Sequence, residues 1–171
     1  MTFHTPNIQN FDLLIVGGGI LGTFHAYHAL RKGLKVALLE KDGLPVGATV
    51  RNFGQVVPSG MNAKWQPLGR RSLEIYQTIQ QQFDISVRQN GSIYLASDAD
   101  EMTLLEEIHA IHRDRGYPCE LWTGTHCMHY LAPLKEDYCL GGLYYPQEIT
   151  LEPTLAIHRI LHHLQSRYGL H

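Results

Sequence analysis

The first forty residues alternate between short apolar runs and one longer amphipathic stretch. Residues 11–16 are apolar except for Asp12 and end at three consecutive glycines, a pattern typical of a buried strand that enters a tight turn. Apolar residues then recur at helical spacing at positions 20, 21, 24, 27 and 30, and Gly33 follows where a left-handed helix cap is expected. Residues 35–39 resemble a second buried strand. The pattern predicts a parallel strand pair with a right-handed helical crossover.

The rest of the chain predicts a mixture of helices and short strands. Residues 41–67 are rich in Gly, Pro, Asn and Ser, and irregular segments of this length are usually functional or mobile. A helix is predicted over 69–83, with Ile75, Tyr76, Ile79 and Phe83 on one face. Asn90-Gly91 lies between two strand-like runs, 85–89 and 92–96, and predicts a hairpin.

The remaining elements are predicted from caps and periodicity. A helix is expected from a cap at Ser97 to about Arg115, with a core face of Leu104, Leu105, Ile108 and Ile111. Further expected elements are a strand at 120–122, a short helix capped by Thr123, a strand at 140–145, a helix at 153–168 closed by Gly169, and the start of a strand at 170–171. The fold class predicted is α/β, a Rossmann-like βαβ unit with the start of a mixed α+β domain.

Composition narrows the functional classes. The 171 residues are 44% hydrophobic, enough for a packed core, and the formal net charge of −2 gives no reason to expect nucleic acid as a partner. Three widely spaced cysteines give no disulfide framework and favour a reducing compartment, which we take as the cytoplasm. The first ten residues contain no Lys or Arg, and the apolar run that follows is short. We therefore expect neither a signal peptide nor a membrane span.

The three glycines at 17, 19 and 22 form a Gly-x-Gly-x-x-Gly motif between the first strand and the helix. Gly17 allows the sharp turn, Gly19 lets the backbone approach a pyrophosphate, and Gly22 lets the helix pack closely on the strand. Glu40 follows at the end of the second strand, where a carboxylate can accept hydrogen bonds from ribose hydroxyls and would repel the 2′-phosphate of NADP. The motif predicts a dinucleotide site that also includes Ile20, Leu21 and Lys41. A glycine-rich turn without a ligand is the alternative, and the unit does not separate FAD from NAD.

The segment 47–55 carries small residues between hydroxyl, guanidinium and amide groups, in the order Gly-Ala-Thr-Val-Arg-Asn-Phe-Gly-Gln. Its arginine can pair with a pyrophosphate, and the backbone of its Asn-x-Gly part can reach a ring system. A polar surface loop accounts for these residues equally well.

Together, the βαβ unit and this segment resemble the FAD-dependent amine oxidoreductases of the D-amino acid oxidase, glycine oxidase and sarcosine oxidase superfamily. The run from Tyr144-Tyr145-Pro146 to Leu151-Glu152-Pro153 also looks like that family's return to the flavin domain. The Arg-Asn-Phe-Gly-Gln version of the motif is most similar to a subgroup associated with aminophosphonate breakdown. The resemblance implies a flavin-binding part at 1–84, a substrate-domain part at 85–146 and a return helix at 147–171.

The resemblance also implies roles for individual residues. Gly17, Gly19 and Gly22 would contact the pyrophosphate, Glu40 the adenosine ribose, Thr49 and Arg51 the phosphates and ribityl chain, and Asn52, Gly54 and Gln55 the isoalloxazine. Many relatives attach the flavin covalently through a His or Cys. Because 47–55 contains neither, we expect non-covalent FAD.

The implied reaction is oxidation of the C–N bond of an amine to an imine. Family members are longer and complete the flavin domain after the substrate domain, so we expect an N-terminal portion, or a subunit completed by a partner chain or by homo-oligomerisation. Two rival functions are an NAD-dependent dehydrogenase and a non-catalytic nucleotide-binding fragment. No catalytic acid or base is identified.

Several other groups of residues have either a functional or an ordinary structural interpretation. The eleven histidines show no familiar ligand spacing, so we expect no metal site, and Cys127 lacks the motif of a nucleophile. Lys64, Arg70 and Arg71 either attract an anionic substrate or are simply solvated, and the second is the more ordinary interpretation. Tyr94 is a candidate for a ring that faces the flavin.

Overall fold

The computed structural model describes residues 9–131, 134–135 and 138–171. The chain forms two compact units. Unit 1 contains the described residues of Met1–Phe53 together with Asp84–Ser86 and Glu152–His171, and unit 2 contains those of Gly54–Phe83 and Val87–Leu151. The chain therefore passes from unit 1 to unit 2 and back, and the division at 1–84, 85–146 and 147–171 stays a prediction. The flavin-binding and substrate-binding roles assigned to parts of the sequence stay predictions.

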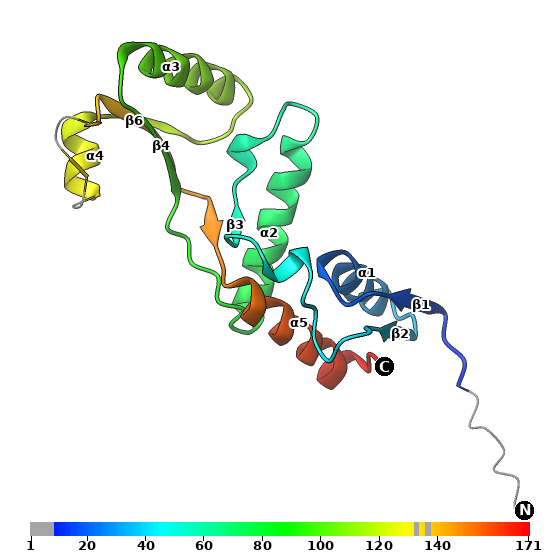
Figure 1. Cartoon of the computed structure of the whole chain (residues 1–171). Helices are drawn as coiled ribbons and strands as arrows, with labels where there is room; N and C mark the ends of the chain where they lie inside the picture. Colours follow the sequence, from blue (N-terminus) through cyan, green and yellow to red (C-terminus); the bar gives the residue numbers. More distant parts are fainter. Residues whose placement is uncertain (1–8, 132–133, 136–137) are drawn as a thin grey trace, which may run out of the picture. The chain divides into compact units, whose positions relative to one another are not determined.

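Unit 1 is built on the predicted βαβ arrangement. Strands β1 (Leu13–Val16) and β2 (Val36–Leu39) pair in parallel, with Leu13 opposite Val36 and Val16 opposite Leu39, and helix α1 (Ile20–Arg31) connects them (Figure 1). Helix α5 (Pro153–Tyr168) packs against α1. The buried residues of this unit come mainly from α1, β2 and α5: Ala26, Tyr27, Leu30, Val36, Ala37, Ile157, Ile160 and Leu164. The predicted strand, helix and strand are thus confirmed.

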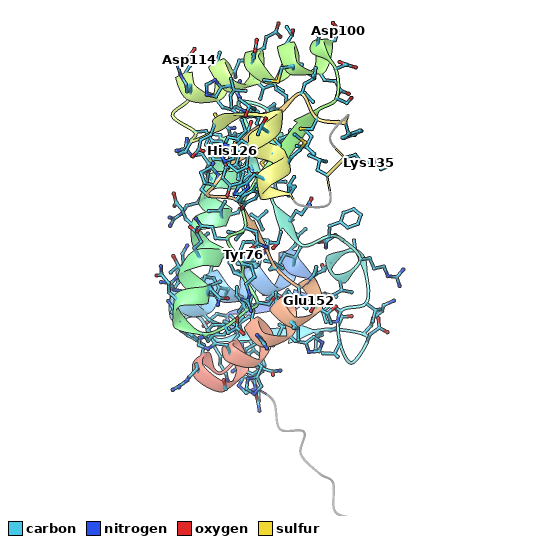
Figure 2. All side chains as sticks on the ribbon, turned by 90° about the vertical axis from the view of Figure 1, so that its left-hand side faces the viewer. Tyr76, Asp100, Asp114, His126, Lys135 and Glu152 are labelled. Atoms are coloured by element: carbon cyan, nitrogen blue, oxygen red, sulfur yellow. The ribbon has the colours of Figure 1, made fainter. Side chains whose placement is uncertain are left out.

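Helix α5 begins and ends where the sequence predicts. Glu152, labelled in Figure 2, precedes its first turn and accepts hydrogen bonds from the backbone N–H groups of the next two non-proline residues. Gly169 closes the helix at φ +68°, the left-handed cap expected of glycine. His171 then donates its N–H to Val36 O and accepts from Leu38 N. This pairing is that of a residue joining the parallel sheet beside β2, as the pattern predicts.

Unit 2 contains a three-stranded antiparallel sheet with a helix on each face. Its strand order is β4 (Ser92–Ala96), β6 (Gly141–Tyr145) and β5 (Glu120–Thr123) (Figure 1). Helix α3 (Ala99–Asp114) covers the face where Ala96, Leu143 and Tyr145 are buried. Helix α4 (Gly124–Tyr130) covers the opposite face, where Cys127 packs with Trp122. Successive side chains of β6 point to opposite faces of the sheet, so each face receives buried residues from this strand.

Four shorter elements belong to the two units. They are η1 (Ala48–Val50) in unit 1 and, in unit 2, β3 (Gln55–Val56), η2 (Pro58–Gly60) and β7 (Ile149–Thr150), which pairs antiparallel with β3. Helix α2 (Gln66–Gln82) begins three residues before the predicted start, with a proline in its first turn. Of its predicted face only Ile79 is fully buried, and Leu73 is the other large apolar side chain buried on this helix.

The predicted hairpin at Asn90-Gly91 is wrong. Gly91 does adopt a left-handed conformation, with φ +73°, but the chain does not fold back there. Arg88 forms a bridge with Thr150, Gly91 N donates to Glu148 O, and Ser92 lies opposite Tyr145. The segment before the glycine and the strand after it therefore both run beside 144–150. Pairing with a distant strand prevails over the local turn signal.

Helix α3 also differs from its prediction. Its cap is Asp98, whose side chain accepts from Glu101 N, while Ser97 donates its N–H and hydroxyl to the Glu101 carboxylate. Leu105 and His112 are its buried residues, whereas Leu104 and Ile111 of the predicted face are 54% and 46% exposed. In Figure 2, Asp100 and Asp114 mark the two ends of this helix.

Candidate cofactor site

The glycine loop between β1 and α1 has the conformation that its sequence requires. Gly17 adopts φ +103°, a region that favours glycine, and its N–H donates to Leu39 O at 2.7 Å. A Cβ on Gly22 would lie 1.9 Å from Gly17 O, so the helix packs on the loop at a distance that only glycine permits. A Cβ on Gly19 would lie 3.0 Å from Thr49 Oγ1. The spacing of the motif therefore corresponds to three separate steric requirements.

Two side chains from outside the loop hold its backbone N–H groups. Gly18 N donates to Glu40 Oε2 at 2.7 Å, and Ile20 N donates to Thr49 Oγ1 at 2.9 Å. From within α1, the buried Thr23 hydroxyl donates to Gly18 O at 2.8 Å. Sequence reasoning missed Thr23, because a threonine in a first helical turn carries no signal that distinguishes it from an ordinary core residue. The loop is thus fixed from β2, from η1 and from its own helix.

Glu40 is held as an anion by the backbone around it. Hydrogen bonds from Gly18 N and then from Asp42 N lower the pKa of its carboxyl below the ordinary 4.5, against the smaller opposing effect of desolvation. The side chain stays accessible to solvent, and each oxygen has a further lone pair. The carboxylate can therefore accept hydrogen bonds from hydroxyl groups of a ligand at neutral pH.

A cleft of about 630 Å³ opens beside the loop, entirely within unit 1. Six of the predicted site residues line it: Gly17, Gly19, Glu40, Lys41, Thr49 and Arg51. Val16, Leu39, Pro45, Val46 and Ala48 add apolar surface. The structure thus brings the glycine loop, the carboxylate at the end of β2 and the hydroxyl and guanidinium of the η1 segment to one cleft.

The other predicted residues have different places. Ile20 and Gly22 belong to the first turn of α1, where Leu21 is 75% exposed. Asn52 closes the η1 turn, with its amide donating to Ala48 O and Thr49 O. Gly54 and Gln55 belong to unit 2, where Gly54 O accepts from Leu151 N and Gln55 lies on β3.

The donor set of the cleft suits a nucleotide with a pyrophosphate. The start of α1 presents backbone N–H groups and the positive end of the helix dipole, and Arg51 adds a cation. The Thr49 oxygen already accepts from Ile20 N, so its proton is available to a phosphate oxygen. Open space beside Gly17 allows its backbone to approach a ligand closely, and Glu40 supplies the acceptor for ribose hydroxyls.

The remaining candidate chemistry finds little support within the described residues. No group of three His, Cys, Asp or Glu side chains there is placed to hold a metal ion. Burial, followed by a hydrogen bond with Cys139, raises the pKa of the Cys127 thiol to about 11, which disfavours a nucleophilic thiolate. His126, labelled in Figure 2, stacks on Trp122 with ring centroids 4.1 Å apart. In the described part of the chain, none of the helices has the length and apolar character needed to cross a bilayer.

The fold and the cleft define a dinucleotide-binding protein of the Rossmann-like class, and comparison with known proteins specifies the family. The model of the FAD-dependent oxidoreductase family named DAO matches residues 12–169, so the chain belongs to this family. Its members depend on FAD, which is the cofactor predicted from the sequence.

Individual relatives and solved structures agree with this assignment. Dimethylglycine dehydrogenase from Rattus norvegicus is 27% identical over 147 residues, which are 83% of this chain and 17% of that protein. Iminodiacetate oxidase from Chelativorans sp. BNC1 is 25% identical with a TM-score of 0.76, over 92% of this chain and 45% of the other. Glycine oxidase from Bacillus cereus ATCC 14579 shares the fold at a TM-score of 0.79 and 24% identity, over 90% and 43%. The chain thus spans less than half the length of these proteins.

Proposed function

We propose that this chain forms the cofactor-binding portion and the first part of the substrate domain of an enzyme that oxidises the C–N bond of an amine to an imine. The observation that carries the proposal is the single cleft shared by the glycine loop, Glu40, Thr49 and Arg51. The names of two relatives, dimethylglycine dehydrogenase and iminodiacetate oxidase, favour amino acids or similar amines as the substrate class. The Arg-Asn-Phe-Gly-Gln segment favours an aminophosphonate within that class.

Each residue of the site has a proposed role. The loop from Gly17 to Gly22, including the backbone of Ile20 and Leu21, would hold the pyrophosphate, and Glu40 with its neighbour Lys41 would hold the adenosine ribose. Thr49 and Arg51 would lie along the phosphates and ribityl chain, and Asn52, Gly54 and Gln55 would approach the isoalloxazine. FAD, when bound, supplies the acceptor for the hydride that leaves the carbon beside nitrogen. We propose non-covalent attachment, because the segment 47–55 offers no His or Cys.

The setting of the enzyme is part of the proposal. We place it in the cytoplasm, because its three cysteines are free thiols in the structure. Further elements would complete the fold, from a partner chain, a second copy or the rest of a longer protein. Leu14 and Val16 on β1 are 59% and 82% exposed, and apolar strand residues of this kind usually pack against a further element.

The first experiment is a visible absorption spectrum of the purified chain, repeated on the filtrate after denaturation. We expect a flavin spectrum that passes the filter, as non-covalent FAD would. Glu40→Gln should lower flavin retention, while Glu74→Gln, on the exposed surface of α2, is the matched control and should retain it. A colourless protein that does not take up added FAD but binds NAD would refute the proposal in favour of a dehydrogenase.

A second measurement separates an enzyme from a non-catalytic subunit. Glycine, N-methylglycine and aminomethylphosphonate are offered to the flavin-loaded chain with an artificial electron acceptor. The measurement is repeated after adding, as a separate chain, the part of a longer family member that this chain does not cover. Reduction of the flavin by any of these amines supports the proposed reaction. Firm flavin binding without reduction in either case would favour the non-catalytic alternative.

A further inference from the structure

Two of the three cysteines meet on one face of the sheet of unit 2. Cys127 lies in α4 and Cys139 lies just before β6, and both pack in one apolar cluster with Trp122 of β5. Cys119 packs on the opposite face, in the cluster that α3 covers. The spacing of the three cysteines predicted no pair, so only the folded chain reveals that two of them are neighbours.

The backbone around the two thiols brings them together. Gly124 N, at the start of α4, donates to Leu140 O at 3.0 Å, and a Cβ on Gly124 would lie 2.3 Å from Cys139 O. A Cβ on Gly142 would lie 3.0 Å from Cys127 Sγ. The two glycines therefore let the segment before β6 run close to the first turn of α4, and they leave space for the Cys127 sulfur.

The proton of each thiol has a defined acceptor. Cys139 Sγ donates to Gly141 O at 3.3 Å. Because that proton is committed, the hydrogen bond between the two thiols is donated by Cys127 to the Cys139 sulfur. Since burial and this hydrogen bond raise the pKa of Cys127 to about 11, Cys127 keeps its proton at neutral pH.

The two cysteines also differ in their access to solvent. Cys127 is fully buried, whereas Cys139 keeps 7% of its surface exposed. An oxidant that arrives from solvent therefore reaches Cys139 first. Cys127 lies behind it, held next to the Cys139 sulfur, and such proximity replaces the reactivity that a protonated thiol lacks.

We propose that Cys127 and Cys139 form a site of reversible oxidation, at which hydrogen peroxide converts the two thiols into an intramolecular disulfide. In the first step the Cys139 sulfur attacks one peroxide oxygen, the O–O bond breaks, and the departing hydroxide takes the thiol proton as water. Cys139 is now a sulfenic acid. In the second step the Cys127 sulfur attacks the Cys139 sulfur, the S–O bond breaks, and the departing hydroxide takes the Cys127 proton as a second water. Two thiols are oxidised and one peroxide is reduced.

The disulfide would fasten α4 to the segment that leads into β6. Closing this loop restricts the unfolded chain, so the oxidised form should be the more stable one. Disulfides in a reducing compartment are usually transient and serve in catalysis or redox sensing, and a thiol reductant would reverse this one. The site requires no flavin, and it is independent of the proposed oxidation of an amine.

The test treats the full chain with hydrogen peroxide, blocks the remaining thiols with iodoacetamide in denaturant, and identifies linked peptides by mass spectrometry. Lys135, labelled in Figure 2, lies between the two cysteines in the sequence, so trypsin leaves their peptides joined only by the disulfide. We expect a bond between Cys127 and Cys139, an alkylated Cys119, and recovery of all three thiols with dithiothreitol. The Tm of the oxidised chain should rise by about 6 °C.

Three alanine variants make the assignment specific. Cys119→Ala is the matched control and should form the disulfide at an unchanged rate. Cys127→Ala lacks the second thiol, so Cys139 should accumulate as a sulfenic acid that dimedone traps. Cys139→Ala should give no dimedone adduct at Cys127, because that sulfur is fully buried and protonated.

Free thiols at both Cys127 and Cys139 after peroxide treatment would overturn the proposal. A mixture of pairs that includes Cys119 would overturn it too, as would an oxidised chain whose Tm does not rise. These results come from the unsubstituted chain, so they do not depend on whether a variant folds. The flavin spectrum is recorded on the same samples. A chain that forms the disulfide and binds no flavin counts against the proposed function alone, and a chain that binds flavin and forms no disulfide counts against this site alone.

Discussion

Replacing Gly22 with alanine should destabilise the chain, although alanine is the better helix former. The added Cβ would lie 1.9 Å from Gly17 O and 3.1 Å from Gly17 C, whereas real Cβ contacts essentially never fall below 3.0 Å. Both neighbours are backbone atoms of a loop that Glu40, Thr49 and Thr23 hold in place, so no flexible side chain can move aside. Overpacking of this kind costs up to about 3 kcal/mol.

Part of this cost is offset by helix propensity. Alanine is favoured over glycine inside a helix by about 1 kcal/mol, which leaves a net destabilisation of about 2 kcal/mol. For a chain of this size such a change lowers Tm by about 4–8 °C. Thermal unfolding followed by circular dichroism measures the shift, and flavin retention should fall in the same variant because α1 must move away from the loop.

Gly43→Ala is the matched control for this change. A Cβ at Gly43 would meet no atom within 4 Å, and its φ lies outside the left-handed region, so its Tm should equal or slightly exceed that of the parent chain. A Gly22→Ala variant that melts as high as Gly43→Ala would refute the steric argument. It would show that the close contact between helix and loop is not a constraint on the folded chain.

Three further changes test the remaining contacts. Thr49→Val removes the acceptor at the start of α1 and should cost about 1 kcal/mol, or about 2–4 °C in Tm, whereas Thr78→Val on the exposed side of α2 should not. The folded-state pKa of Glu40 is lowered, so its contribution to stability is complete above about pH 4.5 and is lost as the pH falls through that lowered pKa. Between pH 6 and pH 3, the Tm of Glu40→Gln should therefore fall less steeply than the Tm of the parent chain. Asp98→Ala removes the cap of α3 and should cost about 1 kcal/mol by urea unfolding, while Asp100→Ala in the same turn should cost less.

The sequence predicted those parts of the structure that depend on neighbouring residues. The βαβ unit, the helix from Pro153 to Tyr168 and its glycine cap all follow from local periodicity and capping, and the structure confirms them. The failure at Asn90-Gly91 has the same origin. The glycine does take the conformation that its residue type favours, but the partner of β4 lies some fifty residues along the chain, and no local pattern specifies such a pairing.

The candidate site divides in the same way. Gly17, Gly19 and Glu40 could be predicted because the motif fixes their spacing. Thr49 and Arg51 could be predicted because the segment 47–55 resembles one found in the family. Glu148 was not predictable. It is a single acidic residue in a polar turn, and its partners come from positions 59, 92 and 117, so only the folded chain shows that they converge.

The buried Glu148 carboxylate, which accepts hydrogen bonds from Ser59, Ser92 and Tyr117, has a consequence for how unit 2 opens. A buried carboxylate that loses even one of its donors is costly, so the segments that supply them have little freedom to detach separately. The amide proton of Ser59 is donated to the Glu148 carboxylate and that of Gly91 to the Glu148 main-chain oxygen, so both should exchange with solvent at similar rates when the segment around Glu148 opens. One residue of unit 2 thus couples the exchange of two amides that lie more than thirty positions apart in the sequence.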